Sequence, residues 1–360
     1  MPDPLASKSS SVQATDPEQA IAEVRRAHDA LKTEIHKIIV GQDDVVDQVL
    51  MCMFCAGHGL IVGVPGLAKT LLISTIARTL SLGFSRIQFT PDLMPSDITG
   101  TEVIEEDKTT GARELRFVKG PIFSNVILAD EINRTPPKTQ AALLESMQER
   151  HVTVGGVQHH LPNPFFVLAT QNPIEQEGTY PLPEAQLDRF MFQIHIGYPT
   201  MEEEAEIVRR SATKANVKIN AVLSNQDILR VQQLVTQCPV ADHVIAYALR
   251  LVRATRIRGD DIANRPQMVK DYVAWGAGPR ASEFMVLSAK ARAILSGEVH
   301  VSPQHIREVA KPILRHRILT NFNAEADQVS TDDIIDGLLE SVPVEGASEE
   351  ERKQMDAVMR

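Results

Sequence analysis

The sequence is poor in aromatic residues, which make up 4% of its 360 residues and include a single tryptophan, Trp275. Proteins that bind single-stranded nucleic acid stack the bases on interleaved aromatic side chains, so this composition argues against such a surface. Basic residues are also outnumbered, since 37 Lys and Arg against 47 Asp and Glu give a net charge of −10. A protein that works on duplex DNA usually carries a basic face, so nucleic acid is an unlikely general partner, although a local basic patch stays compatible with these numbers.

Long apolar runs and a set of paired cysteines are missing as well. No stretch approaches about 18 consecutive apolar residues, and the start of the chain lacks the basic and apolar regions of a secretory signal. Three cysteines leave at least one unpaired and make no disulfide framework, so we expect a protein of the reducing cytoplasm without a membrane span. Cys52 and Cys55 have redox-motif spacing, but their apolar helical surroundings favour buried small hydrophobic residues.

What the sequence does have is the composition of a globular protein, with 43% hydrophobic and 23% charged residues. Its length predicts two or three domains. We expect a flexible tail over residues 1–16, an α/β domain over 17–198, a smaller helical domain over 199–340 and a charged tail over 341–360. Helix starts are expected at Asp16-Pro17-Glu18 and at Thr200 with its following glutamates.

Short apolar runs in the first domain alternate with helical stretches. The runs cover residues 60–62, 87–89, 126–128 and 165–168. Strands that alternate with helices predict a parallel sheet sandwiched between helices. Two inserts interrupt the alternation: residues 92–121, with a predicted hairpin turn at 107–112, and residues 151–161, with a turn at Gly155-Gly156. The second domain shows helical spacing and no strand-rich section.

A glycine-containing loop follows the first apolar run and precedes a predicted helix over 71–80. Its residues are Gly63, Val64, Pro65, Gly66, Leu67, Ala68, Lys69 and Thr70. In a phosphate-binding loop the backbone amides surround phosphate oxygens, while the Lys and the hydroxyl reach the β- and γ-phosphates and Mg²⁺. Ala68 stands where the pattern has a second glycine, which is tolerable if its φ stays negative. The alternative is an ordinary Gly/Pro turn before a lysine.

Polar residues follow two later apolar runs. Asp130 and Glu131 end the run at 126–128, so Asp130 can face a metal while Glu131 faces an attacking water. Asn172 follows the run at 165–168. In an open α/β sheet ligands bind beyond the carboxyl ends of the strands, so these residues should converge on the loop. Taken alone, the acidic pair could be a solvated turn, and Asn172 a turn residue before Pro173.

With these motifs in place, the core resembles an AAA+ ATPase, specifically the MoxR family of the helix-2-insert branch. The resemblance covers about residues 18–320 and rests on GVPGLAKT (63–70), RIQFTPDLMPSDITG (86–100), ILADEINR (127–134), ATQNP (169–173), EGTYPLPEAQLDRFMF (177–192), LVRATR (251–256), GPRAS (278–282) and ILRHRI (313–318). An alanine before the lysine is usual in this family. The sequence departs from it mildly at Val62 and in both tails.

The resemblance implies an α/β fold, an AAA+ core with a parallel five-stranded sheet and a C-terminal all-α lid, and it gives each motif a role. Lys69 and Thr70 bind phosphates and Mg²⁺, Asp130 supports the metal, and Glu131 polarises water. Asn172 is similar to a first sensor of the γ-phosphate, Arg189 to an arginine finger acting on a neighbouring subunit, and Arg280 to a second sensor on the lid. Val40, Gly41 and Gln42 stand where such ATPases contact adenine. For each arginine, the alternative is a surface ion pair.

The implied function is hydrolysis of ATP with Mg²⁺ by a homo-oligomeric ring, in this family a hexamer. The family couples hydrolysis to chaperone-like remodelling or maturation of a protein client, often together with a von Willebrand factor A domain protein. Other hypotheses are a nucleic-acid motor or transcription activator, a magnesium-chelatase-type ATPase subunit, and a nucleotide-binding module without turnover. The insert contains no GAFTGA loop, which argues against the activator. The arginines at 250, 253, 256 and 258 favour a subunit interface over a solvated helix face.

Overall fold

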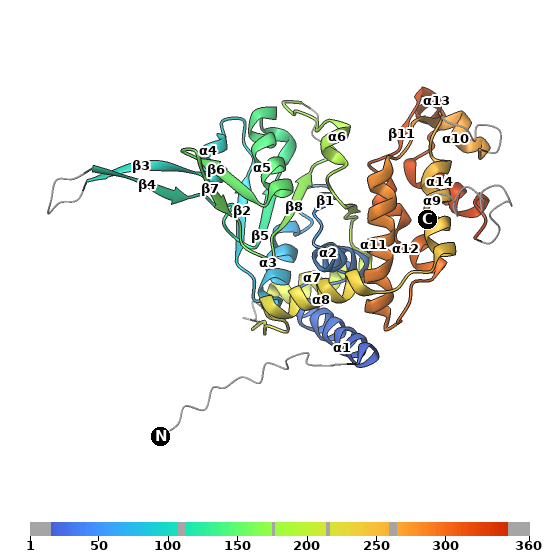
Figure 1. Cartoon of the computed structure of the whole chain (residues 1–360), viewed down its shortest axis with the longest axis horizontal. Helices are drawn as coiled ribbons and strands as arrows, with labels where there is room; N and C mark the ends of the chain where they lie inside the picture. The colour runs from blue at the N-terminus through green and yellow to red at the C-terminus, as the bar shows by residue number, and fades with distance from the viewer. Residues whose placement is uncertain (1–15, 107–112, 175–176, 214–216, 259–264, 345–360) are drawn as a thin grey trace, which may run out of the picture.

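The computed structural model describes residues 16–106, 113–174, 177–213, 217–258 and 265–344. The predicted tails at 1–16 and 341–360 lie mostly outside these residues, and the predicted turn at 107–112 lies entirely outside them. Figure 1 shows a sheet with helices on both sides, a helical lid beside it, and a two-stranded ribbon that projects from the opposite end. No helix of the described residues is long and apolar enough to cross a membrane.

The centre of the structure is a parallel sheet in the order β2-β5-β8-β1-β9. Its strands are β1 (Gly59–Val62), β2 (Phe84–Gln88), β5 (Val126–Asp130), β8 (Phe166–Gln171) and β9 (Phe192–His195). Alternate residues of one strand enter different cores: Val126 and Leu128 pack on one face, Ile127 and Ala129 on the other. Both faces of the sheet are therefore buried, as the near-continuous apolar runs predict.

Helices cover both faces of this sheet. One face carries α1 (Pro17–His36), α2 (Asp43–Phe54) and α3 (Lys69–Thr79), and the other carries α4 (Pro95–Thr99), η1 (Ile132–Arg134) and α5 (Pro137–Glu149). The predicted start of α1 is confirmed, because Asp16 accepts a hydrogen bond from the Glu18 amide at 3.2 Å and Pro17 occupies the first turn. The short α6 (Glu184–Leu187) precedes β9.

Two antiparallel hairpins interrupt the α/β alternation. The first is formed by β3 (Gly100–Glu106) and β4 (Arg113–Lys119), and the second by β6 (His151–Val154) and β7 (Val157–His160) around Gly155 and Gly156. Their bases touch, since the Phe117 and His159 rings stack with centroids 4.0 Å apart. The longer hairpin extends away from the sheet (Figure 1).

Helices dominate the chain after β9: α7 (Met201–Thr213), α8 (Asn225–Gln237), α9 (Asp242–Ala254), α10 (Gln267–Tyr272), α11 (Pro279–Ser296), α12 (Pro303–Leu314), α13 (Phe322–Ala326) and α14 (Thr331–Ser341). This helical character is confirmed, with one addition. The short strands β10 (Val273–Trp275) and β11 (Leu319–Thr320) pair antiparallel within the lid. Because α9 ends at Ala254, Arg256 and Arg258 lie beyond it, so the four arginines do not share one helix face as the spacing suggests.

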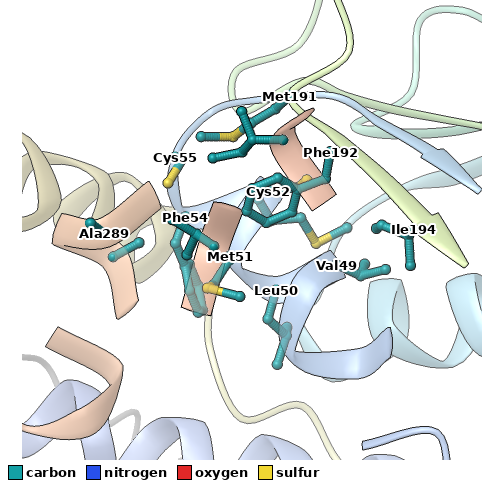
Figure 2. Close-up of a cluster of buried hydrophobic side chains, with 14 of the residues drawn as sticks. Val49, Leu50, Met51, Cys52, Phe54, Cys55, Met191, Phe192, Ile194 and Ala289 are labelled. Atoms are coloured by element: carbon teal, nitrogen blue, oxygen red, sulfur yellow. The ribbon is translucent and has the colours of Figure 1, made fainter. Parts of the chain in front are cut away.

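The lid and the α/β core share one hydrophobic cluster. Figure 2 shows Cys52 and Phe54 of α2, and Cys55 directly after this helix, beside Phe192 of β9 and Ala289 of α11. All three cysteines are free and buried, which agrees with their interpretation as small core residues. Burial raises the pKa of the Cys52 and Cys55 thiols, so neither is a ready nucleophile.

Candidate functional site

A cavity of about 420 Å³ lies at the carboxyl ends of β1, β5 and β8. It collects most of the residues that the motifs singled out, from four segments of the chain. Its walls are Pro65, Gly66, Leu67, Ala68, Lys69, Thr70, Leu71, Arg86, Asp130, Glu131 and Asn172. The expected convergence of loop, acidic pair and amide at one sheet edge is what the structure shows.

The loop after β1 is shaped by close approaches of the backbone. A Cβ added to Gly63 would lie 2.8 Å from the Ile196 carbonyl oxygen, so only glycine fits there. Gly66 has φ +87°, a conformation that favours glycine. The Lys69 ammonium donates to the carbonyl oxygens of Gly63 at 2.5 Å and Val64 at 3.3 Å, so the loop bends over its own lysine.

Ala68 corrects one expectation about this loop. Its φ is +54°, in the left-handed region. The sequence-based expectation, that alanine is tolerable here if its φ is negative, is therefore wrong. It is the residue immediately before α3, where a left-handed conformation sets the direction of the helix N-terminus. An L residue in this region costs about 1–2 kcal/mol. The loop therefore keeps the backbone shape of a glycine at a position occupied by alanine.

Asp130 is held between two side chains at the end of β5. Thr170 of β8 donates its hydroxyl to Oδ1 at 2.6 Å, and Arg86 of β2 donates Nη2 and Nε to Oδ2 at 2.6 and 3.0 Å. Asp130 is 8% exposed. The carboxylate is thus fixed in the cavity wall with its negative charge partly compensated by Arg86.

Glu131 follows in a left-handed conformation, with φ +56°. That conformation turns the chain sharply after the strand, and the Glu131 amide donates to the Thr170 hydroxyl at 2.8 Å. Its carboxylate accepts from Gln88 of β2 at 3.1 Å and lies 3.5 Å from Arg134. A carboxylate held at the cavity by one amide and one exposed arginine can still accept a hydrogen bond from water.

Lys69 and Asn172 complete the polar wall. Burial lowers the pKa of the Lys69 ammonium, while the charges of Asp130 and Glu131 oppose that shift. Asn172 is buried, and its Oδ1 accepts from the Ile174 amide at 3.2 Å. Its Nδ2 is buried and has no partner among the described residues. An unpaired donor beside a phosphate-type loop fits an anionic ligand.

The donor set also fits a magnesium ion bound together with phosphates. Mg²⁺ prefers oxygen ligands and usually takes one or two protein groups while keeping waters and substrate phosphates. The Thr70 hydroxyl and the Asp130 carboxylate are groups of this kind in the same cavity wall. Within the described residues, no group of three or more His, Cys, Asp or Glu side chains could hold a metal ion.

Arg189 and Arg280 do not line this cavity. Arg189 lies between α6 and β9, half-buried, and no hydrogen bond or ion pair with the described residues engages its guanidinium. Arg280, in the first turn of α11, donates to Asp188 Oδ2 at 3.2 Å. Neither arginine therefore contacts the phosphate loop of its own chain.

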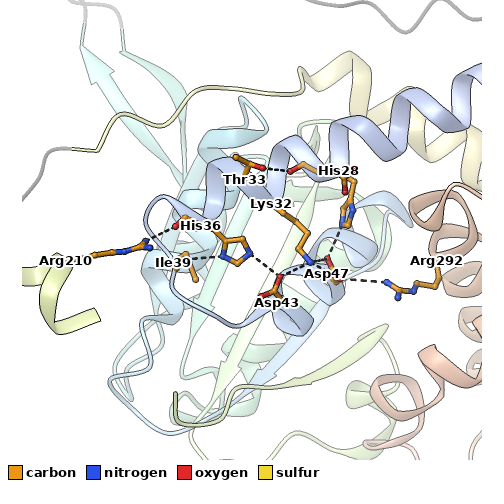
Figure 3. A network of polar contacts seen from close by, with 10 residues as sticks. His28, Lys32, Thr33, His36, Ile39, Asp43, Asp47, Arg210 and Arg292 are labelled. Carbon is orange, nitrogen blue, oxygen red and sulfur yellow. Dashed lines mark hydrogen bonds and ion pairs between the residues drawn. The ribbon is translucent and has the colours of Figure 1, made fainter. Parts of the chain in front are cut away.

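Val40, Gly41 and Gln42 also lie outside the cavity wall. They form the turn between α1 and α2, with Gly41 and Gln42 at positive φ. Glu203 of α7 lies so close that a Cβ on Gly41 would meet its carboxylate. Figure 3 shows polar contacts around this turn, including Arg210 of α7 donating to the His36 carbonyl at 2.8 Å and His36 facing Ile39 and Asp43. The adenine contact remains a prediction.

Comparison with known proteins agrees with this geometry. Residues 58–192 match the ATPase family associated with various cellular activities (AAA), and residues 265–338 match the AAA lid domain. The chain is 46% identical over 310 residues to Chaperone MoxR1 of Mycobacterium tuberculosis, covering 86% of this chain and 80% of the relative. The chain belongs to the MoxR family of AAA+ ATPases.

Two further relatives agree with this membership. Protein YeaC of Bacillus subtilis is 38% identical over 311 residues, which are 86% of this chain and 92% of YeaC. A crystal structure of a Cytophaga hutchinsonii protein superposes with a TM-score of 0.82 at 43% identity, covering 91% of this chain and 97% of the other. The MoxR-family fold, an AAA core with a helical lid, thus extends over nearly the whole chain.

Sequence reasoning missed the partners that hold the acidic pair. Arg86 and Gln88 both come from β2, where period-two alternation puts them on one side of the strand, and Gln88 is in register with Asp130. Thr170 lies in the motif at 169–173, but the motif does not predict that it hydrogen-bonds both acidic residues. The signal available was the spacing of the polar residues 86 and 88 on either side of the buried Ile87 in this edge strand.

Proposed function

We propose that this MoxR-family chain hydrolyses Mg-ATP at the cavity and that assembly into a ring brings Arg189 to the cavity of a neighbouring subunit. The observation that carries the proposal is the meeting of Lys69, Asp130, Glu131 and Asn172 around one phosphate-type loop. Arg189 supports the proposal of a ring, because its guanidinium has no partner among the described residues and does not line the cavity of its own chain.

Each residue has a role that follows from its position. The loop amides and Lys69 neutralise the β- and γ-phosphates, and Asn172 Nδ2 donates to a γ-phosphate oxygen. Thr70 and Asp130 hold Mg²⁺, which neutralises charge on the phosphates when it is bound. Glu131 orients the attacking water and accepts its proton. A guanidinium from the adjacent subunit stabilises the charge of the transferring phosphoryl group, worth about 10³–10⁵ in rate.

We further propose that hydrolysis drives remodelling or maturation of a protein client. A relative 46% identical to this chain is named a chaperone. The β3–β4 and β6–β7 hairpins stand apart from the nucleotide cavity, so they offer surface for a client without blocking ATP. A net charge of −10 favours a protein client over nucleic acid.

The test is ATPase activity per subunit against protein concentration, with size followed by light scattering. We expect wild-type activity to rise steeply with concentration. Glu131→Gln should bind ATP and lose hydrolysis by about 10³ or more, and Arg189→Ala should lose hydrolysis while still binding ATP. Arg209→Ala is the matched control, since this arginine of α7 is exposed and pairs only with Glu206 among the described residues. Hydrolysis that is independent of concentration and unaffected by Arg189→Ala would refute the shared site.

A further inference from the structure

Lid residue Arg317 contacts the core segment that carries Arg189, namely residues 188–191, here called the finger segment. Its Nε donates to Asp188 Oδ1 at 2.7 Å. Its Nη2 donates to the backbone carbonyls of Asp188 at 2.8 Å and Phe190 at 2.7 Å, and its Nη1 to that of Met191 at 3.3 Å. One side chain therefore holds the backbone on both sides of Arg189.

The surroundings of Arg317 show a built site. Its side chain is 2% exposed, its Nη1 also donates to the Ile313 carbonyl at 2.6 Å, and its guanidinium lies 5.2 Å from the Phe284 ring centroid. Burial lowers the pKa of Arg317 to about 10, opposed by the charge of Asp188, so it stays protonated at neutral pH. The planar fork of arginine can serve several carbonyls at once, whereas a lysine ammonium cannot do so in this geometry.

Other contacts fix the same segment. His316 lies 3.0 Å from the Phe190 carbonyl through Nε2, and the Met191 amide donates to the His58 carbonyl at 2.7 Å. The Met191 and Phe192 side chains are buried in the hydrophobic cluster that includes Cys52 and Phe54 of α2 (Figure 2). The backbone of the finger segment is thus fixed, while the Arg189 guanidinium is left without a described partner.

We propose that Arg317 is a positioning residue for Arg189, which fixes the finger segment so that the guanidinium projects in one direction toward the neighbouring subunit. This inference rests on the proposed function. Asp188 connects it to the predicted second sensor, since its other oxygen accepts from Arg280 at 3.2 Å. A finger misplaced by about 1 Å can cost about 10² in rate, so the fixed backbone has a direct catalytic consequence.

The experiment mixes two inactive variants. Arg189→Ala subunits have intact cavities and no finger, and Glu131→Gln subunits have a finger and no working cavity. Mixed rings regain activity only where an intact cavity meets an intact finger. The Glu131→Gln subunit, which donates the finger, is then replaced by Glu131→Gln/Arg317→Gln, and by Glu131→Gln/Arg317→Lys in case the first does not fold. Circular dichroism and binding of a fluorescent ADP analogue check that each donor is folded.

We expect the donors changed at Arg317 to restore at least tenfold less activity than the Glu131→Gln donor, with unchanged KM for ATP, because the measured cavities are unaltered. The matched control is Glu131→Gln/Arg315→Gln. Arg315 is also mostly buried and forms a bidentate pair with Asp332 in the lid, but its contact with this region is a single 3.5 Å bond to the Gln193 carbonyl. This donor should restore activity fully.

The outcomes separate the two proposals. If Glu131→Gln subunits do not rescue Arg189→Ala subunits, the proposed shared site fails. If they do rescue, and a folded donor changed at Arg317 rescues equally well, the shared site stands and the positioning role of Arg317 is overturned.

Discussion

The nucleotide cavity and the Arg317 guanidinium at the Asp188 junction, where Arg280 and Arg317 meet the finger segment, differ in how their polar groups are paired. In the cavity, Asn172 Nδ2 has no partner among the described residues, and Ala68 and Glu131 have positive φ. At the junction, each guanidinium nitrogen of Arg317 has at least one acceptor.

This difference indicates different tasks. Unpaired donors and strained backbone cost stability and persist where a ligand will use them. A fully paired, buried arginine fixes geometry, and removing it leaves its acceptors unsatisfied. We therefore expect changes in the cavity to alter activity more than stability, and changes at the junction to alter both.

The largest effect on stability is expected from Arg317→Gln. Removing this buried, hydrogen-bonded charge takes one of two arginine partners from Asp188 and a donor from several carbonyls, so the free energy of unfolding should fall by about 3 kcal/mol. Glu131→Gln should change it by less than about 0.5 kcal/mol, because that side chain is only half-buried. Urea unfolding followed by circular dichroism compares the two. If both variants lose the same free energy of unfolding, the proposed difference between the junction and the cavity is contradicted.

The next effect concerns activity in the cavity. Asn172→Ala should lower kcat for ATP by about 100-fold, since one fixed donor to the transferring group is lost. The stability of the variant should stay the same or rise, because a buried amide nitrogen that has no partner in the described part of the chain is removed. Steady-state hydrolysis and thermal unfolding measure the two effects. A loss of stability as large as that expected for Arg317→Gln would show that Asn172 stabilises the fold and is not kept for a ligand.

The junction should also respond to pH through His316. Burial lowers its pKa well below the ordinary value, and the positive charge of Arg317 adds to this, so folded His316 stays neutral. The unfolded chain gains a proton as pH falls through about 6.5, so this contribution is present above that pH and is lost below it. Between pH 6.5 and 5.5 the wild type should lose about 1 kcal/mol that His316→Gln does not lose.

Chemical unfolding at both pH values measures this difference. The exposed His243 offers a control, because His243→Gln should keep the wild-type pH dependence. A gap between wild type and His316→Gln that does not change with pH would contradict the prediction.

The smallest effect is expected from Ala68→Gly. Glycine removes the steric cost of φ +54° but adds freedom to the unfolded chain, so stability should rise by about 0.5–1 kcal/mol or less. ATP affinity should persist, because the backbone conformation is already that of glycine. Thermal unfolding and nucleotide titration check both expectations. A loss of about 1 kcal/mol, as at a helix interior, would mean that the left-handed conformation is wrong.

Much of the fold could be predicted because its strands are nearly continuous apolar runs. The runs at 60–62, 126–128 and 165–168 each overlap a strand of the central sheet, and helical spacing predicts the helices of the lid. The strand β9 was not located, because its residues alternate polar and apolar at the edge of the sheet and follow a proline-rich loop. The β10–β11 pair was missed because strands of two or three residues leave no periodicity.

The site divides in the same way. Lys69, Asp130, Glu131 and Asn172 could be placed together because each lies at or after the carboxyl end of a strand. The contacts of Arg86 with Asp130, and of Arg317 with Asp188, could not be predicted. They join residues 44 and 129 positions apart, and such pairings depend on tertiary packing that spacing does not encode.

The β3–β4 hairpin has a mechanical consequence. Seven residues per strand at about 3.3 Å each make an arm of about 20 Å, joined to the body at Gly100 and Gly120. A tilt of about 10° at that base would therefore carry the far end through about 3.5 Å. Ile104 and Leu115 sit opposite each other on one side of the arm, 69% and 68% exposed. A small rotation in the body thus becomes, at the outer end of the described strands, a displacement as large as the width of a side chain.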